Sequence, residues 1–585
     1  MASQLRQLSV RSPGSEGLSS EISPFQSSQE FALRADNAVI DRVGRLACRE
    51  AFADLITKYD GGSPTYDIVR LCQLQGEDAP RNIYTAEFGD AEYKNAEYNG
   101  FYVEGGIKVD STFGLMGEGS PFLRKKKIRG TMSDEVKPIV GVQYESYVGF
   151  HQKGDELKII EEIRPSNGLT NAAIVVLKSE AYVFSKGEEA MVWDGTNARK
   201  LSETNNYFPP QQGGVEGNDG SIEGEEVLAP IIDGEIACSA YGRLWVSGVN
   251  DDYQTIYFSD MLQGHRWYDG NAVMDDAGNS AGIIDVAEYW PDGEDTITGI
   301  AAHNGFLIVF GRNSILIYSG AQGDPAAEQG LKLEDAIRDV GLVNQDAMCN
   351  IGTDHLFVDS LGVRSLGRVI QEKSAPISEP SMNVASVIRP LIERYSRTVR
   401  LLHMPSKSLM VCLFPALREA YVFQLGRPSA TGGMRITRWT DCDFLDSITV
   451  RTKLENKTLL GGRDSRGLCI YEGYKQPRDY AFRYESTVLS GTDNLMQTMI
   501  PKSTSFSFHT DKTPSVFNAT WGFGADMEYS RPLRNPKGKS EFKTVTTSLN
   551  GTGEMLRIGF DSMIEGNELS MQQITLNILL GRIIV

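Results

Sequence analysis

Some strand-like stretches of the chain are apolar at every position, without the polar alternation of a sheet that faces water on one side. The segment 305–320, GFLIVFGRNSILIYSG, reads as two strands around a turn from Gly311 to Ser314. Successive side chains of a strand point to opposite faces, so an uninterrupted apolar strand needs cover on both of them. We therefore predict a hairpin at 305–320 that lies between two other layers.

Five further segments repeat this pattern of a strand, a short turn and a second strand that ends in an aromatic residue or glycine. The six segments begin at residues 172, 242, 305, 354, 407 and 457, at intervals of 70, 63, 49, 53 and 50. The last three intervals are close to the roughly 40 to 50 residues of a four-stranded propeller blade, whose inner strands are covered by neighbouring blades. Loop insertions such as 211–226 would explain the wider early intervals. A series of β-sandwich strands is the alternative interpretation.

The segments outside the six hairpins also read mainly as strands. The sequence therefore predicts a mainly β chain, with a β-propeller core, an N-terminal arm or insertion and a C-terminal β-sandwich-like domain. Polar strands such as TSFSFHT and KTVTTSL near the C-terminus are typical of a sandwich. One helix is expected at 381–396, where apolar residues recur at helical spacing, and Pro390 should kink or shorten it. The predicted divisions are an arm with first strands at 1–50, a Gly/Tyr-rich insertion at 51–135, the propeller at 136–475 and the C-terminal domain at 476–585.

Composition narrows the classes of function. A length of 585 residues exceeds what one hydrophobic core supports, and no run is long and apolar enough for a membrane span. The polar N-terminal stretch lacks the apolar region of a secretory signal, so we expect folding in a cytoplasm. With 58 basic and 77 acidic side chains the net charge is −19, which argues against a protein that grips nucleic acid through its phosphates.

Motifs that carry chemistry are absent from the sequence. The seven cysteines and six histidines are scattered without the spacing of a zinc site, and the odd number of cysteines does not indicate a disulfide framework. We expect no catalytic residue, no metal and no cofactor. One dense basic run, RKKKIR, is a candidate contact for phosphate or an acidic partner, with a solvated loop as the alternative. Its basic residues are Arg124, Lys125, Lys126, Lys127 and Arg129.

Several segments follow one another along the chain in an order that resembles a known family. GLSSEISPF and NAVIDRVGRLACREAF are followed by GRLWVSG…TIYFSD, DTITGIAAHNGFLIVFGRNSILIYSG, VGLVNQDAMCNIGTDHLFVDSLGVRSL, APISEP and GEMLRIGF. This series resembles the nozzle, or tail tubular B, proteins of short-tailed bacteriophages. The most specific part is 242–366, and its motifs are packing and turn patterns rather than catalytic ones. The resemblance spans most of the chain in order.

The resemblance implies a structural virion protein: a homohexameric tube at the distal end of the tail, assembled in the host bacterial cytoplasm. Such a tube joins the adaptor ring beneath the portal, contacts tail fibres or spikes, and lets double-stranded DNA pass without sequence-specific binding. The chain is shorter than the larger members of the family, which suggests a reduced insertion. The family pattern also predicts extended strands at 37–60, where helical periodicity of Val39, Val43, Leu46 and Leu55 suggests a helix.

Net charge suggests a physical mechanism for such a conduit. Basic residues along the lumen would hold DNA phosphates, whereas an acidic or neutral wall would not. We expect much of the negative charge to face the channel or its mouth. The alternatives are a propeller glycan hydrolase, which needs two carboxylates about 5 to 9.5 Å apart, and a receptor-binding or scaffold propeller. No sialidase-type repeat is present, and an open ring would distinguish the conduit from these alternatives.

Overall fold

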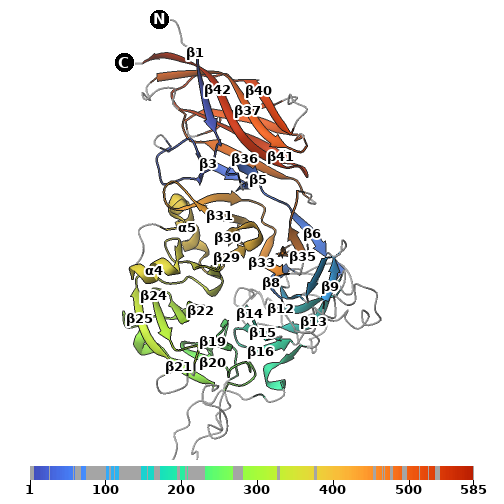
Figure 1. The fold of residues 1–585 in the computed structure, drawn as a ribbon, viewed down its shortest axis with the longest axis vertical. Helices are drawn as coiled ribbons and strands as arrows, with labels where there is room; N and C mark the ends of the chain where they lie inside the picture. Colours follow the sequence, from blue (N-terminus) through green and yellow to red (C-terminus); the bar gives the residue numbers. More distant parts are fainter. Residues whose placement is uncertain are drawn as a thin grey trace, which may run out of the picture.

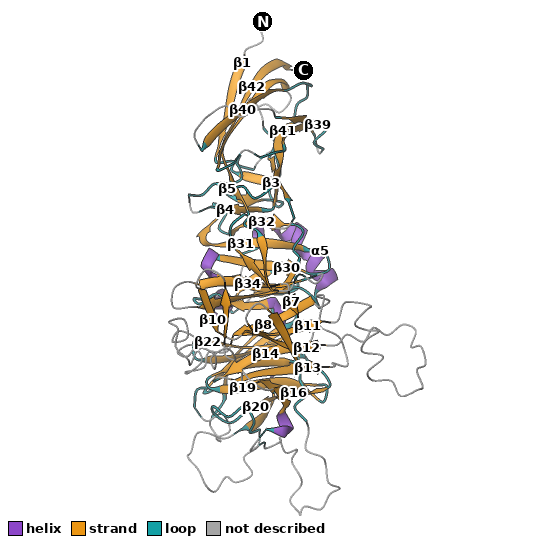
Figure 2. Cartoon of the chain, turned by 90° about the vertical axis from the view of Figure 1, so that its right-hand side faces the viewer, coloured by secondary structure: helices purple, strands orange, loops and turns teal. Residues whose placement is uncertain are grey.

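The molecule is elongated, with a β-sandwich at one end and a ring of blades at the other (Figures 1 and 2). Both chain termini lie at the sandwich end. The computed structural model describes residues 5–583 with these segments excepted: 25–26, 42, 57, 60–66, 74–99, 104–106, 111, 118–146, 154–155, 164–171, 179, 194–197, 205–206, 208–230, 268–280, 324, 326–329, 374–378, 452–455, 464–465, 467, 475–477, 490–496, 513, 525 and 534–540. No helix in the described part is long and apolar enough to cross a membrane.

The ring is a β-propeller with seven blades among the described strands. Blade 1 has the strand order β13-β12-β11-β8 from the outside inward, with the short β7 beside β13. Blades 2, 3 and 4 are four-stranded antiparallel sheets in chain order. Their strands are β7 (Lys58–Tyr59), β8 (Asp67–Gln73), β11 (Thr112–Gly117), β12 (Tyr147–Lys153), β13 (Glu156–Ile163), β14 (Ala172–Leu177), β15 (Glu180–Ser185), β16 (Glu188–Trp193), β17 (Ala198–Lys200), β18 (Ile236–Ala240), β19 (Arg243–Val249), β20 (Asp252–Phe258), β21 (Gly282–Asp285), β22 (Ile297–His303), β23 (Phe306–Gly311), β24 (Ser314–Ser319) and β25 (Lys332–Arg338).

Blades 5, 6 and 7 complete the ring. Blade 5 has three strands, blade 6 has four, and blade 7 takes its outermost strand, β6, from the N-terminal part of the chain. The first strands of neighbouring blades pack against one another, except that β22 of blade 4 packs against the 3₁₀ turn Gln345–Ala347 that precedes blade 5, and β33 of blade 7 packs against β8 of blade 1. The elements are β6 (Phe52–Ile56), β26 (Met348–Asn350), β27 (His355–Val358), β28 (Val363–Ser365), β29 (Arg400–Met404), β30 (Leu409–Phe414), β31 (Glu419–Pro428), β32 (Met434–Trp439), β33 (Phe444–Arg451), β34 (Asn456–Gly462) and β35 (Leu468–Tyr471). The hairpin β9 (Gly100–Val103) and β10 (Ile107–Asp110) lies beside the ring.

The fully apolar hairpin β23–β24 has neighbours on both faces, as predicted. Val309 packs in a cluster with Trp245 of blade 3, whereas Phe310 packs in a different cluster with Phe357 of blade 5. The ring centroids of Phe310 and Phe357 are 5.2 Å apart. The other five predicted hairpins are also present, in blades 2, 3, 5, 6 and 7. The mainly β propeller fold is therefore confirmed by strand pairing within this chain.

The β-sandwich consists of two sheets built from both ends of the chain. The outer sheet has the order β4-β5-β42-β37-β40, with β1 also beside β42; the bridging sheet has the order β3-β36-β41-β38-β39, with β2 beside β3. The bridging sheet joins blade 6 where Asp36 of β3 pairs with Arg438 of β32. The strands are β1 (Leu5–Arg11), β2 (Gly17–Leu18), β3 (Phe31–Asp36), β4 (Ala38–Ile40), β5 (Leu46–Cys48), β36 (Tyr480–Ser486), β37 (Gln497–Thr510), β38 (Phe517–Phe523), β39 (Tyr529–Pro532), β40 (Phe542–Ser548), β41 (Leu556–Ile564) and β42 (Leu569–Ile583).

The strand pairing divides the chain differently from the predicted boundaries. The described part of the expected N-terminal arm belongs to the sandwich up to Cys48, because β1 pairs with residues 573–579. Part of the expected insertion belongs to the propeller, because β6 closes blade 7 while β8 and β11 belong to blade 1. Pairings between strands hundreds of residues apart leave no local pattern in the sequence, so the sequence did not indicate these two arrangements.

Two short helices flank blade 5, α4 (Leu366–Glu372) and α5 (Ala385–Tyr395). Helix α5 confirms the helix predicted at 381–396, with Ile388 and Ile392 buried and Pro390 inside it. Residues 37–60 form strands β4, β5, β6 and β7, as the family pattern predicts. The helical periodicity there was misleading, since Val43 lies in a turn and is 72% exposed.

Candidate functional site

The basic run predicted as a contact site, Arg124, Lys125, Lys126, Lys127 and Arg129, lies outside the described residues. Its role stays a prediction. Chemistry-bearing side chains gather elsewhere, around the axis of the propeller, where the innermost strands of several blades meet. We call this group the hub, consisting of Arg70, Gln345, Asp346, Arg400 and Asp446.

Asp346 lies between two arginines at the hub. It belongs to the 3₁₀ turn η4 (Gln345–Ala347), which leads into blade 5, whereas Arg70 and Arg400 are on the first strands of blades 1 and 6. The guanidinium of Arg70 forms an ion pair with the Asp346 carboxylate, and Nε of Arg400 lies 3.9 Å from Oδ2 of Asp346. The arginine side chains are only 10% and 5% exposed. One carboxylate thus links three blades.

A second carboxylate, Asp446 on β33 of blade 7, completes the charged side of the hub. It accepts hydrogen bonds from the backbone nitrogens of Leu71, at 2.7 Å, and of Ser447, at 2.9 Å. Burial raises the pKa of Asp446, while the positive charges of Arg70 and Arg400 oppose this rise. Arg400 also donates from Nη1 to the carbonyl oxygen of Leu445, at 2.8 Å. These contacts connect blades 1, 6 and 7.

Gln345 links the uncharged side of the hub. Its Oε1 accepts from the backbone nitrogen of Ile300 at 2.9 Å, and its Nε2 donates to the carbonyl oxygens of Ala237 and Ile300 at 3.2 Å. These acceptors lie on the first strands of blades 3 and 4. The neighbouring Asn344 donates to Ser396 and Val399. The segment 344–346 therefore connects blades on opposite sides of the ring, and no spacing signal in the sequence pointed to it.

A groove with a volume of 440 Å³ opens beside the hub and includes Asp346 in its lining. Its polar groups bond to one another: Lys186 donates to the hydroxyl of Tyr253 at 2.9 Å, and that hydroxyl donates to Glu235 at 2.7 Å. Burial raises the pKa of Tyr253 to about 12, so its hydroxyl remains a donor at neutral pH. The groove presents two carboxylates, Glu235 and Asp346, each already bonded to a neighbouring side chain.

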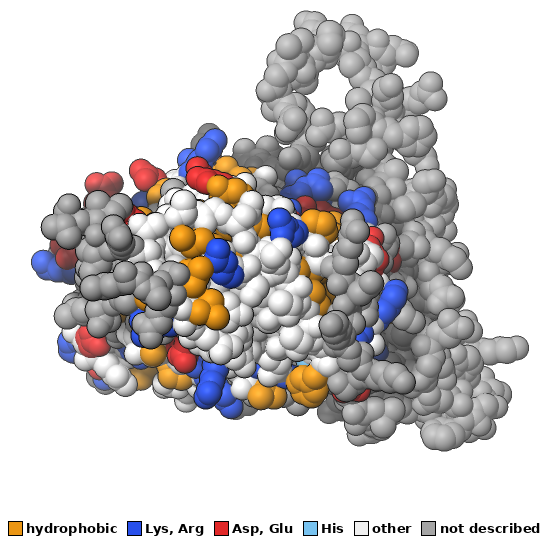
Figure 3. All heavy atoms as spheres, turned by 90° about the horizontal axis from the view of Figure 1, so that it is seen from above, with side chains coloured by type: hydrophobic (Ala, Val, Ile, Leu, Met, Phe, Trp, Pro, Cys, Tyr) orange, Lys and Arg blue, Asp and Glu red, His pale blue; other side chains and the backbone are white. Residues whose placement is uncertain are grey.

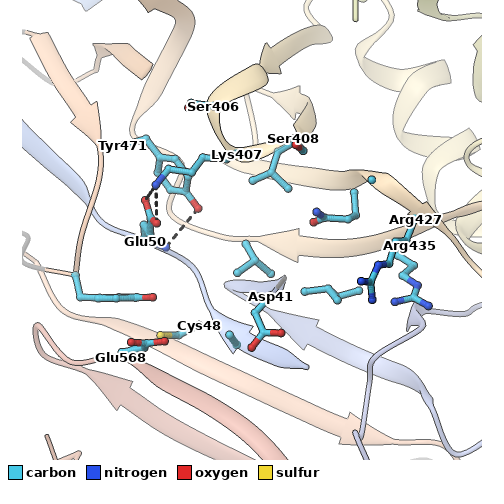
Figure 4. Close-up of a pocket in the computed structure, with 17 residues that line it drawn as sticks. Asp41, Cys48, Glu50, Ser406, Lys407, Ser408, Arg427, Arg435, Tyr471 and Glu568 are labelled. Atoms are coloured by element: carbon cyan, nitrogen blue, oxygen red, sulfur yellow. Dashed lines mark hydrogen bonds and ion pairs between the residues drawn. The ribbon is translucent and has the colours of Figure 1, made fainter. Parts of the chain in front are cut away.

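A second cavity, of 480 Å³, lies at the junction of the propeller and the sandwich (Figure 4). Lys407 of blade 6 forms an ion pair of 2.7 Å with Glu50, whose backbone nitrogen donates to the hydroxyl of Tyr471. Burial raises the pKa of Glu50, and the hydrogen bond to Lys407 opposes the rise. Burial also raises the pKa of the Cys48 thiol to about 12, so this thiol stays protonated and unreactive. The cavity is therefore lined by polar groups where the propeller and the sandwich meet.

The cysteines and histidines form no metal site in the described residues. No group of three or more histidine, cysteine, aspartate or glutamate side chains there is arranged to hold a metal ion. The seven cysteines are not joined by disulfide bonds. Burial raises the pKa values of Cys238, Cys349, Cys442 and Cys469 to about 12. None of these thiols is a thiolate nucleophile at neutral pH.

Comparisons with known proteins give no family for this chain. No family model and no curated protein matches it. Among solved structures, it is similar to the Neurospora crassa Pan2 WD40 domain (TM-score 0.30, 8% identity, 56% of this chain and 84% of that chain) and to BamB from Moraxella catarrhalis (0.29, 7%, 56% and 81%). It is also similar to an exo-β-1,3-galactanase from Phanerochaete chrysosporium (0.20, 10%, 91% and 100%). Similarity at this level does not extend to function, and the propeller is assigned from strand pairing alone.

Proposed function

We propose that this propeller protein is a structural subunit of a short-tailed phage tail, the distal nozzle through which DNA is ejected. The observation that carries the proposal is the ordered resemblance of the chain to that family. Its most specific part, 242–366, coincides with strands and turns of blades 3, 4 and 5, from β19 to the first residue of α4. A resemblance in packing residues transfers the fold and its assembly role rather than a reaction.

The hub supports a conduit that forms between copies of the chain rather than through one propeller. Arg70, Asp346 and Arg400 meet across the axis, and Gln345 binds the opposite blades. A duplex passing along this axis would have to break these buried ion pairs, each of which is costly to disrupt. DNA would therefore pass through a ring of subunits, with adaptor and fibre contacts on its outside.

A propeller glycan hydrolase is the second candidate, and the two hub carboxylates favour it. Asp446 has a pKa raised by burial, as a general acid requires, and Asp346 borders the open groove. Both carboxylates, however, lie beside the same two arginines. Side chains committed to neutralising each other are better suited to holding blades together than to protonating a substrate.

Electron microscopy of the purified full chain, alone and mixed with the tail adaptor ring, tests the proposal. Sixfold rings with an open centre would support the nozzle function. Single propellers that remain monomeric with the adaptor present would overturn it. The same preparation is then tested for release of reducing sugar from bacterial surface polysaccharides, with Asp446→Asn as the matched variant. Hydrolysis by the natural chain that Asp446→Asn abolishes would establish the second candidate instead.

A further inference from the structure

The outer sheet of the sandwich ends in β40 on one side and, on the opposite side, in β1 and, beyond β5, in β4. Strand β40 pairs with β37 on one side, and β1 pairs with β42 on the other; neither pairs with another described strand on its free side. Both strands are seven residues long. An unpaired edge presents backbone donors and acceptors to any strand that can lie beside it.

The directions of these edge strands match for a continuous sheet. Each neighbouring pair in the series β40, β37, β42 and β1 is antiparallel. The strand β1 therefore runs opposite to β40, so β1 of one copy can lie antiparallel beside β40 of the next. The core-facing residues also match, since Val10 of β1 and Val545 of β40 are both buried on the same side of the sheet. Repeating this heterologous contact builds a ring when the rotation between copies closes.

Exposed apolar side chains lie at the ends of the edge strands of this sheet. The three most exposed large apolar side chains of the described residues are Val43 at 72%, Leu5 at 63% and Phe542 at 58%. Leu5 begins β1 and Phe542 begins β40, while Val43 lies in the turn between β4 and β5. Both residues lie on the same face as the exposed residues of their strands, at opposite ends of the sheet. In an antiparallel contact Leu5 lies beside the end of β40 and Phe542 beside the end of β1 of the neighbouring copies, where removing part of each side chain from water favours association.

The middle of the solvent face of the outer sheet is almost uncharged, although the chain carries a net charge of −19. Hydroxyl and amide groups bond across its strands, as between Ser505 and Thr546 at 2.8 Å and between Asn577 and Ser503 at 2.9 Å. Seen from above, much of the sandwich end is polar uncharged side chain or backbone, with a few basic and hydrophobic side chains between (Figure 3). Three rows of solvent-face residues run across β1, β42, β37 and β40, and Arg11 is their one charged residue. The first row is Arg11, Gln573, Ser507 and Thr544, the second is Ser9, Thr575, Ser505 and Thr546, and the third is Gln7, Asn577, Ser503 and Ser548.

We infer that copies of this chain join edge to edge through β1 and β40, so that the outer sheets form one closed barrel whose inner wall is the uncharged face. The bridging sheet covers the other face of the outer sheet, and a closed ring has room for that second layer only on its outside. The uncharged face then looks across the channel, where its three rows offer DNA phosphates no basic group except Arg11. This inference rests on the proposed function and names the surface that would form the conduit.

Engineered cysteines test the edge contact in the full chain. Ser9→Cys is combined in turn with Thr544→Cys, Thr546→Cys or Ser548→Cys, which all lie on the solvent face and sample the three registers that keep this face continuous. Neighbouring strands lie about 4.8 Å apart, within the Cα separation of a disulfide. The two cysteines of one copy are separated by three strand spacings, so they cannot join within a chain. We expect one combination to give a ladder of covalent oligomers after oxidation, ending at the size of the ring.

The controls separate this inference from the proposed function. Each single variant can give covalent dimers at most, and Ser9→Cys with Ser530→Cys, on the edge strand β39 of the bridging sheet, should give no ladder. Rings seen by electron microscopy without a ladder in any register would overturn the edge contact and leave the nozzle function standing. A ladder that grows without closing into rings would also overturn the barrel, because it would show an open filament.

Discussion

The two ends of the molecule differ in whether their outermost strands have pairing partners. In the propeller, β6 pairs with β35, so a strand from the N-terminal part of the chain completes the last blade. In the outer sheet, neither β1 nor β40 pairs with a further strand among the described residues. The contrast is visible in two phenylalanines that begin these strands: Phe52 of β6 is 2% exposed and Phe542 of β40 is 58% exposed. The propeller ring closes within one chain, whereas in our proposal the outer sheet closes between chains.

Removing Phe52 should have the largest effect. Its ring lies 4.9 Å from that of Phe444 and 5.8 Å from that of Trp439, so Phe52→Ala leaves a cavity where blade 7 is closed. We expect the free energy of unfolding to fall by about 3 to 5 kcal/mol. Urea denaturation followed by tryptophan fluorescence measures this change. The matched variant Phe542→Ala should change it by about 0.5 kcal/mol or less; equal losses would contradict the difference between the two edges.

Removing the Asp346 carboxylate from the hub should have the next largest effect. Asp346→Ala leaves Arg70 and Arg400 buried without the carboxylate that links them, which we expect to cost about 3 kcal/mol. Asp292→Ala is the control, because its ion pair with Arg338 joins side chains that are 51% and 62% exposed and should contribute about 1 kcal/mol at most. Thermal unfolding of the two variants makes the comparison. A hub variant as stable as the control would mean that the ring does not depend on its axial ion pairs.

Mild acid should weaken the propeller through His355, which is 8% exposed. Burial lowers the pKa of His355, and the nearby His303 lowers it further. The unfolded chain has the ordinary value of about 6.5. As the pH falls from there towards the lower folded pKa, the unfolded state binds a proton that the folded state excludes, so the free energy of unfolding decreases.

The test compares natural chain and His355→Gln by urea denaturation at pH 7.5 and pH 5.5. We expect the natural chain to lose more stability than the variant, by at most about 1.4 kcal/mol for each pH unit of the window. The same loss in both proteins would show that His355 takes up its proton equally in the folded and unfolded states.

The smallest change is expected from Phe542→Ser, which acts on association rather than folding. The side chain is exposed in one copy, so the free energy of unfolding should stay within about 0.5 kcal/mol of the natural value. If Phe542 is covered by the next copy, its loss should cost about 1 kcal/mol per contact, or roughly a fivefold weaker association. Sedimentation velocity over a range of concentrations measures this shift. Unchanged association would place Phe542 outside the contact between copies.

Local pattern predicted those parts of the fold whose cause is local. The uninterrupted apolar run 306–310 indicated cover on both faces, and Val309 and Phe310 do pack against different blades. Helix α5 followed from helical spacing, and six hairpins followed from strand-turn-strand patterns. Blade 1 was not among the six predicted hairpins, because most of its sequence lacks that pattern, and the strands of 37–60 were predicted only through the family resemblance.

The candidate site was beyond prediction from local pattern. Arg70, Asp346 and Arg400 are far apart in the sequence, and each alone resembles an ordinary surface residue. Only the order of the blades around the axis brings them together. The same holds for the groove, where Lys186 meets Tyr253 of the next blade. The predicted basic run 124–129 remains untested.

The sequence by itself determined where strands and turns form and which strands are covered on both faces, because these properties depend on neighbouring residues and on the twofold period of a strand. The tertiary structure alone decided that β6 closes blade 7, that both chain ends share one sandwich, and that charged residues meet at the hub. Those contacts join residues hundreds of positions apart, and their energies depend on burial and on partners that no local window contains.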